Sequence, residues 1–188
     1  MYKWTICVLT VPEREQDLTR IEGMLLHQID NRNDIQLLID KGTGDVGKKR
    51  QRCLEEAAGD YICFVDDDDL IAHDYIERIY ELLDGEVDYI GFQLQHYRNG
   101  EKQKPTFHSL KYKEWSEDDN GWYRDVSHLN PIKTSIAREG VFEGAYGEDK
   151  AWAEQVNPKT EHYIDAPMYF YFFSDEHSLT AGDSNGNA

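Results

Sequence analysis

Short apolar segments alternate with amphipathic segments through the first half of the chain. The predicted strands cover residues 3–9, 35–39, 60–65 and 87–95, and the predicted helices between them cover residues 13–28, 46–58 and 73–83. Continuous apolar strands separated by helices are typical of a mostly parallel sheet with helices on both faces. The sequence therefore predicts an α/β fold.

The ends of the first three strands carry the first candidate site residues. Thr10, Asp40 and Asp66 follow or close these strands. Ligands in open parallel sheets bind outside the carboxyl ends of the strands. We therefore expect one crevice to collect the three side chains.

Four adjacent aspartates, Asp66 to Asp69, stand at the end of the third strand. Their charges repel one another, which favours a bound divalent cation and the phosphates that it carries. Side chains alternate along an extended segment, so Asp66 and Asp68 should point one way and Asp67 and Asp69 the other. Asp69 is also placed to cap the following helix.

Two other interpretations of the aspartates fail on spacing. A calcium-binding EF-hand loop starting at Asp66 needs glycine at its sixth position, where Ile71 stands. A phosphatase of the haloacid dehalogenase type needs Thr or Val where Leu70 stands, and its first Asp usually lies on the first strand.

Two further charged patterns lie on either side of the aspartates in sequence. Lys48, Lys49, Arg50 and Arg52 are a dense basic cluster, which is either a solvated helix face or a counterpart of the acidic strand end. A short helix is predicted over residues 149–156, opened by Gly147-Glu148, so that Glu148-Asp149 falls at its start. Acidic residues are favourable in a first helical turn, but a carboxylate here could also act as a general base.

Composition limits the class of protein. With 188 residues, 39% of them apolar, the chain is long enough for one domain with a real core. The net charge of −17 argues against general nucleic-acid binding and against docking on an anionic membrane. No apolar run approaches the ~20 residues of a membrane-spanning helix. The three cysteines, Cys7, Cys53 and Cys63, show no metal-ligand spacing and indicate reduced thiols and a cytoplasmic protein.

The second half is less regular. Residues 96–125 are polar and aromatic and predict hairpins and loops, with a mobile loop over 114–121, and late strands are predicted at 163–164 and 168–173. The aromatic residues that could stack on a sugar or a base, or simply pack, are Tyr112, Trp115, Trp122 and Tyr123. Trp152 is expected in the core or on a ligand-binding platform, and His128 is a lesser candidate for ligand or metal contact.

Four segments of the chain together form a recognisable pattern. They are Thr10-Val11-Pro12-Glu13-Arg14; Gly47-Lys48-Lys49-Arg50 with Ala57-Ala58-Gly59-Asp60-Tyr61 through Asp69; Tyr146-Gly147-Glu148-Asp149-Lys150-Ala151-Trp152; and Tyr171-Phe172-Phe173 with His177-Ser178-Leu179-Thr180. In this order they resemble the GT-A glycosyltransferases, most closely the family 2-like enzymes. The resemblance spans residues 3–180. It implies a GT-A (Rossmann-like) domain over 1–180, with a nucleotide-sugar-binding half (1–95), a smaller mixed acceptor-binding half (96–180) and a flexible tail (181–188).

The resemblance also implies roles for the matching residues. Thr10 and Asp40 would contact the donor's nucleoside base, and Arg50 the base or the phosphates. Asp66 and Asp67 would hold the ribose or the sugar, and Arg14 is assigned to donor binding. The implied metal ligands are Asp68 and His177. The implied catalytic residues are Asp149 as base, and Glu148 as its acceptor-binding neighbour or the alternative base.

The sequence departs from the family pattern in four places. Gln51 replaces the usual Asn, and Asp67 stands where a small residue is common, so the carboxylate that holds the ribose stays open. The gap between His177 and Ser178 is shortened. Residues 91–125 match no known motif, and acceptor specificity should lie there.

The expected function is metal-dependent transfer of a sugar from a nucleotide-diphosphate donor, most simply a UDP-sugar, to an acceptor hydroxyl. A Mn²⁺ or Mg²⁺ ion would neutralise the leaving group, and direct attack with one base gives inversion. The acceptor stays open among a glycan, a protein, a lipid-linked sugar and a modified nucleobase. The alternatives are a non-catalytic nucleotide-sugar or glycan-binding module on a GT-A scaffold, and a D-x-D phosphatase or phosphotransferase.

Overall fold

The computed structural model describes residues 1–173 as one mixed sheet flanked by helices. Its strands are β1 (Tyr2–Leu9), β2 (Ile35–Asp40), β3 (Gly59–Asp66), β4 (Leu70–Ile71), β5 (Tyr89–Arg98), β6 (Glu101–Lys102), β7 (Thr106–His108), β8 (Ser116–Glu117), β9 (Trp122–Arg124), β10 (Ile132–Lys133) and β11 (Glu161–Phe173). Its helices are the 3₁₀ turn η1 (Pro12–Arg14), α1 (Glu15–Ile29), α2 (Val46–Glu56), α3 (Tyr75–Leu82), α4 (Thr134–Ala137) and α5 (Glu148–Ala153).

The sheet follows the order β2-β1-β3-β10-β5-β7-β9-β8, with β11 beside β5. Strand β1 pairs in parallel with β2 and β3, and β11 pairs in parallel with β5, whereas the short β10 is antiparallel to both neighbours. The mostly parallel α/β fold that the sequence predicted is confirmed.

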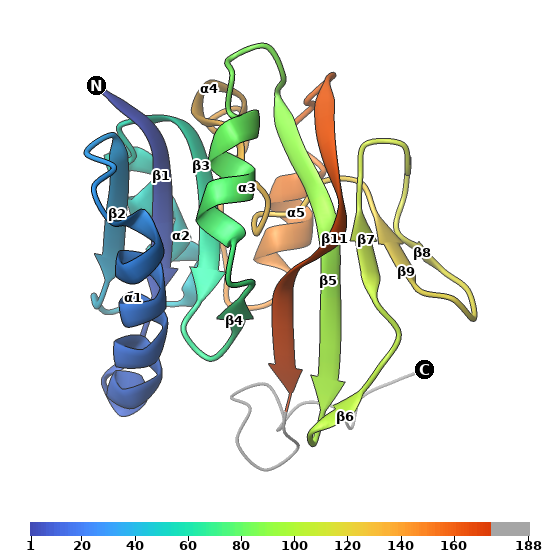
Figure 1. Cartoon of the computed structure of the whole chain (residues 1–188), viewed down its shortest axis with the longest axis horizontal. Coiled ribbons are helices and arrows are strands. Elements are labelled where there is room, and N and C mark those ends of the chain that lie inside the picture. The colour runs from blue at the N-terminus through green and yellow to red at the C-terminus, as the bar shows by residue number, and fades with distance from the viewer. Residues whose placement is uncertain (174–188) are drawn as a thin grey trace.

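Helices cover both faces of the sheet. Trp4, Ile6 and Val8 of β1 pack in the cluster that includes the apolar stripes of α1 and α3, and Cys7 and Leu9 pack in the cluster that includes residues of α2 and α5. Figure 1 shows α1 and α3 in front of the sheet and α2 and α5 behind it. The alternation of β1 side chains between two apolar cores explains why its sequence is apolar at nearly every position.

The first three strands end together. Leu9 is in register with Asp40 of β2 and with Asp66 of β3, and the three arrowheads lie at the lower edge of the sheet in Figure 1. This register brings residue 10, the end of β2 and the aspartates to one edge.

Several predicted boundaries were wrong. Gly59 does not cap α2 but begins β3, where a Cβ atom would lie only 2.6 Å from the backbone nitrogen of Thr5. The two predicted late strands are one strand, β11, with register shifts between Ile164 and Tyr169. The expected mobile loop over 114–121 contains β8 and the turn of the β8–β9 hairpin.

The remaining predictions from the sequence concern the cysteines, membrane-spanning helices and the division of the domain. Cys7, Cys53 and Cys63 are free and buried, as predicted. Within residues 1–173, no helix is long and apolar enough to cross a membrane. The division of the domain at residue 95 stays a prediction, and His177 and the tail 181–188 lie outside the described residues.

Candidate active site

The four aspartates alternate between exposed and buried positions. Asp66 and Asp68 are partly exposed, whereas Asp67 and Asp69 are 2% and 0% exposed. The burial of the four side chains alternates as predicted, but the segment is not extended: β3 ends at Asp66, and the next residues form a turn in which the N–H of Asp69 donates to the carbonyl of Asp66 over 3.3 Å.

Asp69 does not cap the following helix, which corrects that expectation. Helix α3 begins at Tyr75, and its N-cap position is Asp74. Asp69 instead accepts a hydrogen bond of 2.9 Å from the backbone N–H of Phe172 in β11. Burial raises the pKa of Asp69 well above its ordinary value, so this carboxyl tends to be protonated, and it links the aspartates to β11.

Arg14 bridges the aspartates on the crevice side. Its Nη1 lies 2.9 Å from Oδ1 of Asp67 and 2.8 Å from Oδ2 of Asp68. Burial raises the pKa of Asp68 to about 6, against the opposing effect of the Arg14 charge. A guanidinium therefore supplies the positive charge that four adjacent aspartates were expected to attract.

Arg50 joins the aspartates to the start of α5. The side chain is 6% exposed, and its Nη2 lies 3.2 Å from Asp66 while its Nε lies 3.2 Å from Glu148. The family resemblance implies that Arg50 contacts the donor's base or phosphates. In the structure, however, its Nη2 and Nε atoms already contact carboxylates. Its remaining Nη1 is buried without a partner among the described residues.

A tight backbone approach brings the start of α5 close to α2. The backbone N–H of Gly47 donates to the carbonyl of Gly144 over 2.9 Å, and a Cβ atom at Gly47 would lie 2.6 Å from that oxygen. Gly147, at the N-cap of α5, has a φ of 67°, a conformation that favours glycine. These glycines allow Glu148 and Asp149 to lie opposite α2, the helix that carries the basic cluster.

Glu148 and Asp149 have different surroundings. Glu148 is 6% exposed, and its carboxylate accepts a hydrogen bond from Nε of Arg50, whereas the side chain of Asp149 is 30% exposed. Burial raises the pKa of Glu148, and the charge of Arg50 opposes this shift. Of the two, Asp149 is the carboxylate that an incoming hydroxyl can reach.

His128 lies beside Asp149. Its Nδ1 is 3.8 Å from Oδ2 of Asp149, and neither ring nitrogen has a hydrogen-bond partner among the described residues. Burial lowers the pKa of His128 well below its ordinary value, so the ring is neutral. A neutral imidazole can still donate one N–H to a carboxylate.

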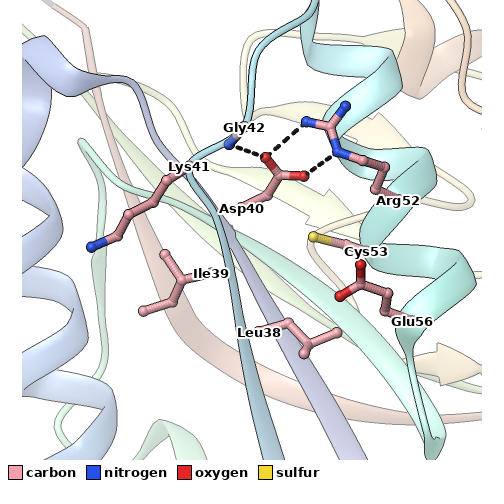
Figure 2. A pocket seen from close by; sticks show the side chains of 8 residues that line it. All are labelled: Leu38, Ile39, Asp40, Lys41, Gly42, Arg52, Cys53 and Glu56. Carbon is pink, nitrogen blue, oxygen red and sulfur yellow. Dashed lines mark hydrogen bonds and ion pairs between the residues drawn. The ribbon is translucent and has the colours of Figure 1, made fainter.

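A pocket opens beside Asp40 at the edge of the sheet. It has a volume of about 280 Å³ and is lined by Leu38, Ile39, Asp40, Lys41, Gly42, Arg52, Cys53 and Glu56 (Figure 2). Arg52 donates to both carboxylate oxygens of Asp40 over 2.7 and 2.9 Å, and the N–H of Gly42 donates over 2.7 Å. Although burial acts in the opposite direction, these hydrogen bonds lower the pKa of Asp40.

The sequence analysis did not propose Arg52 as a site residue, although its place near the end of the basic cluster could have indicated a partner for Asp40.

The basic cluster also reaches the end of β1. Thr10 is buried at this neighbouring strand end, and its carbonyl accepts a 2.5 Å hydrogen bond from Nζ of Lys49. The basic cluster is therefore not a solvated face, because only Lys48 among its four members is largely exposed, with a 70% exposed side chain.

The described residues do not contain a complete metal site. Within residues 1–173, no three His, Cys, Asp or Glu side chains converge as ligands. Asp66 and Asp68 are partly exposed oxygen donors at one edge, and Mg²⁺ commonly uses one or two carboxylates and completes its shell with phosphate oxygens and water. The donor set therefore fits a hard divalent ion. His177 lies outside the described residues.

The aromatic residues of the second half mostly contact one another. Trp152 is core, since it is 1% exposed and stacks on Phe142. Tyr123 lies between Phe107 and Tyr112, with ring centroids 5.3 and 4.9 Å away. Packing thus accounts for these rings, whereas Trp115 contacts Arg124 and Lys150 instead.

Several solved structures share the fold of this chain and belong to longer chains. S. aureus TarS 1-349 in complex with UDP-GlcNAc matches with a TM-score of 0.68 at 16% identity, covering 98% of this chain and 62% of that chain. S. aureus TarS matches with a TM-score of 0.64 at 17% identity, covering 93% and 37%. The chain thus spans less than two thirds of the TarS chains.

A third solved structure, A197 from STIV, matches with a TM-score of 0.52 at 14% identity over 91% of this chain and 86% of that chain. At these identities the likeness shows the fold alone. A search of curated proteins found no match. The model of the family "Glycosyl transferase family 2" matches residues 26–143, which is more than half of the chain. The chain therefore belongs to glycosyl transferase family 2.

Proposed function

We propose that the chain is a metal-dependent, inverting glycosyltransferase that moves a sugar from a nucleotide-diphosphate sugar to an acceptor hydroxyl. The observation that carries this proposal is the buried Arg50, which binds Asp66 at the acidic strand end and Glu148 next to Asp149. One guanidinium thus ties the proposed donor end to the proposed base. Family membership supports glycosyl transfer as the chemistry.

The proposed donor is a UDP-sugar. Two of the TarS structures contain UDP-GlcNAc and UDP, and this chain shares their fold. We assign the nucleoside to the edge formed by Thr10 and Asp40, where the pocket lies. Asp66 and Asp67 stay assigned to the ribose or the sugar of the donor, and Arg14 to donor binding. For Arg50 we propose a supporting role, because its contacts are with carboxylates.

The proposed metal ligand is Asp68, with Asp66 beside it. A bound Mn²⁺ or Mg²⁺ ion would offset the negative charge that develops on the leaving diphosphate. Arg14 holds Asp68 at 2.8 Å, so this ion pair must loosen when the cation binds. His177 stays a proposed further ligand.

Asp149 is the proposed general base. Its partly exposed carboxylate would take the proton of the acceptor hydroxyl as the hydroxyl oxygen attacks the anomeric carbon. Attack on the face opposite the leaving group inverts that carbon. Glu148 is the weaker candidate, because its carboxylate already accepts a hydrogen bond from Arg50. His128 would position Asp149 by donating an N–H to it.

The test is UDP release from UDP-GlcNAc in the presence of Mn²⁺, with water or an added acceptor. We expect release by the native protein, a loss of at least about 100-fold in Asp149→Asn with UDP affinity unchanged, and loss of metal-dependent UDP binding in Asp68→Asn. Asp60→Asn, an exposed change on β3, is the matched control. Binding without release would instead support a non-catalytic nucleotide-sugar module. Neither binding nor release with any UDP-, GDP- or CDP-sugar would overturn the proposal.

The acceptor class stays open among a glycan, a protein, a lipid-linked sugar and a modified nucleobase. We also propose a cytoplasmic location, which rests on the three free cysteines.

A further inference from the structure

Arg124, at the end of β9, carries a guanidinium without a polar partner in the part of the chain that the structure describes. Within residues 1–173, no hydrogen bond or ion pair reaches its side chain, although the residue is partly buried. Burial lowers its pKa, and the negative charge of Asp149 opposes this shift. None of its nitrogens is among the fully buried side-chain atoms that lack a partner in residues 1–173, so its N–H groups stay accessible to a ligand.

The guanidinium is held in place by an aromatic ring. Its Cζ lies 4.1 Å from the ring centroid of Trp115, and Nζ of Lys150 lies 5.6 Å from the same ring. A cation over an aromatic face keeps the edges of the guanidinium free for hydrogen bonds. Trp115 therefore serves as a support for Arg124, and a second cation stands close by.

The position of this pair relates it to the reaction. Lys150 follows the proposed base Asp149 directly, and Asp149 is close enough to act on the charge of Arg124. Pairing of β9 with β7 aligns Arg124 with His108, whose side chain is buried. The unpaired guanidinium therefore lies beside the proposed base, on the side formed by the second half of the chain.

The local charge balance differs from that of the whole chain. Residues 96–124 contain six Lys and Arg against five Asp and Glu, whereas the full chain has 20 against 37. Within this segment, Glu117 pairs with Lys104, and Asp118 accepts hydrogen bonds within its own turn. An anionic group would thus meet less repulsion here than elsewhere on the chain.

We infer that Arg124, held on Trp115 beside Asp149, binds an oxyanion of the acceptor, so that the acceptor carries a phosphate or carboxylate group near its reacting hydroxyl. Guanidinium groups bind both oxyanions through two parallel N–H bonds. The assignment of this anion to the acceptor rests on the proposed function.

The test uses the indole N–H of Trp115 as a reporter in ¹H–¹⁵N spectra. The chain has four tryptophans, and Trp115→Phe identifies the signal. Glycerol 3-phosphate, glycerate and glycerol are titrated at constant ionic strength, with and without UDP and Mg²⁺. We expect both anions to shift the signal with dissociation constants on the order of 1–10 mM, and glycerol to leave it unchanged. The tighter anion indicates whether the acceptor group is a phosphate or a carboxylate.

Two variants decide the outcome. Arg124→Gln should weaken anion binding at least about tenfold, whereas Lys113→Gln, which removes an exposed charge from the same segment, should change it less than about twofold. A shift that survives Arg124→Gln, or no shift with either anion, overturns the inference. Loss of the anion response on saturation with UDP would assign Arg124 to the donor diphosphate and would also overturn it. Failure of the proposed function is distinguishable, because UDP and Mg²⁺ would then change no signal in the same spectra.

Discussion

Arg50 and Glu148, which are 98 positions apart in sequence, form an ion pair of 3.2 Å inside the protein. Their side chains are only 6% and 8% exposed. The pair connects α2 to α5, and the second contact of Arg50, with Asp66, connects both to the end of β3. The proposed donor and acceptor ends are thus joined by one buried cation.

Removal of Arg50 should destabilise the protein strongly. Arg50→Met leaves Glu148 and Asp66 without their cation, which for a buried pair costs about 3–5 kcal/mol of unfolding free energy. Lys48→Met on the same helix, where the side chain is 70% exposed, should cost less than about 0.5 kcal/mol. Urea unfolding measures both. A cost for Arg50→Met as small as that of the control would contradict the role of the pair.

Arg14 should compete with a metal ion. Because its Nη1 lies 2.9 and 2.8 Å from Asp67 and Asp68, Arg14→Met should leave more negative charge for a cation and raise Mn²⁺ affinity without nucleotide about tenfold. Isothermal titration calorimetry measures this affinity. Arg20→Met, which removes an exposed ion pair with Asp17, is the control and should have no effect. Weaker Mn²⁺ binding in Arg14→Met would show that Arg14 helps to hold the site open for the ion.

Asp68 should make stability depend on pH. Its folded-state pKa of about 6 is above the ordinary value of 3.8, so the folded protein holds this proton more tightly than the unfolded chain. The contribution of Asp68 to stability therefore falls as the pH rises from about 4 to about 6. Asp68→Asn should reduce this fall, as measured by urea unfolding across that range. Parallel pH profiles for the native protein and the variant would contradict the raised pKa.

Most strands and helices in the first half of the chain could be predicted, because the apolar patterns that define them are local in sequence. The apolar runs of β1, β2 and β3 fix their bounds to within one or two residues. The alternating burial of the four aspartates was expected from an extended segment, but it arises in a turn that follows Asp66. The two-residue strands β4 and β10 could not be predicted, because they exist only through pairing with distant strands. The irregular register near Pro167 hid the continuity of β11.

His128 should favour activity at the expense of stability. Both ring nitrogens are buried without partners among the described residues, so His128→Phe should keep or raise the unfolding free energy, by about 1 kcal/mol at most. The same change should lower kcat for UDP release at least about tenfold, because Asp149 loses its neighbouring N–H. Urea unfolding and UDP release measure the two effects.

His108→Phe is the contrasting variant. Its Nδ1 lies 2.5 Å from Oδ1 of Asn130, so removal of the imidazole should cost about 1–3 kcal/mol by leaving a buried polar group unpaired. A stability loss of this size in His128→Phe as well would mean that His128 has a structural hydrogen bond.

The candidate site could be predicted only in its residue types. Sequence reasoning singled out Asp40, Arg50 and Asp66 as candidates, since each stands in a recognisable pattern. It could not find that Arg52 binds Asp40 or that Arg50 binds Glu148, because these pairs depend on the angle at which α2 lies against the sheet and on the tight approach at Gly47. Ion-pair partners are set by tertiary geometry, which spacing along the chain does not encode.

The most direct test of the central claim is the melting temperature of the native protein, Asp68→Asn and Asp149→Asn with UDP-GlcNAc and Mn²⁺. A ligand at 100 times its dissociation constant stabilises the folded state by about 2.7 kcal/mol. We predict a metal-dependent increase for the native protein and for Asp149→Asn, and its loss in Asp68→Asn. No metal-dependent increase with UDP-, GDP- or CDP-sugars, or an increase that Asp68→Asn leaves unchanged, would contradict the account.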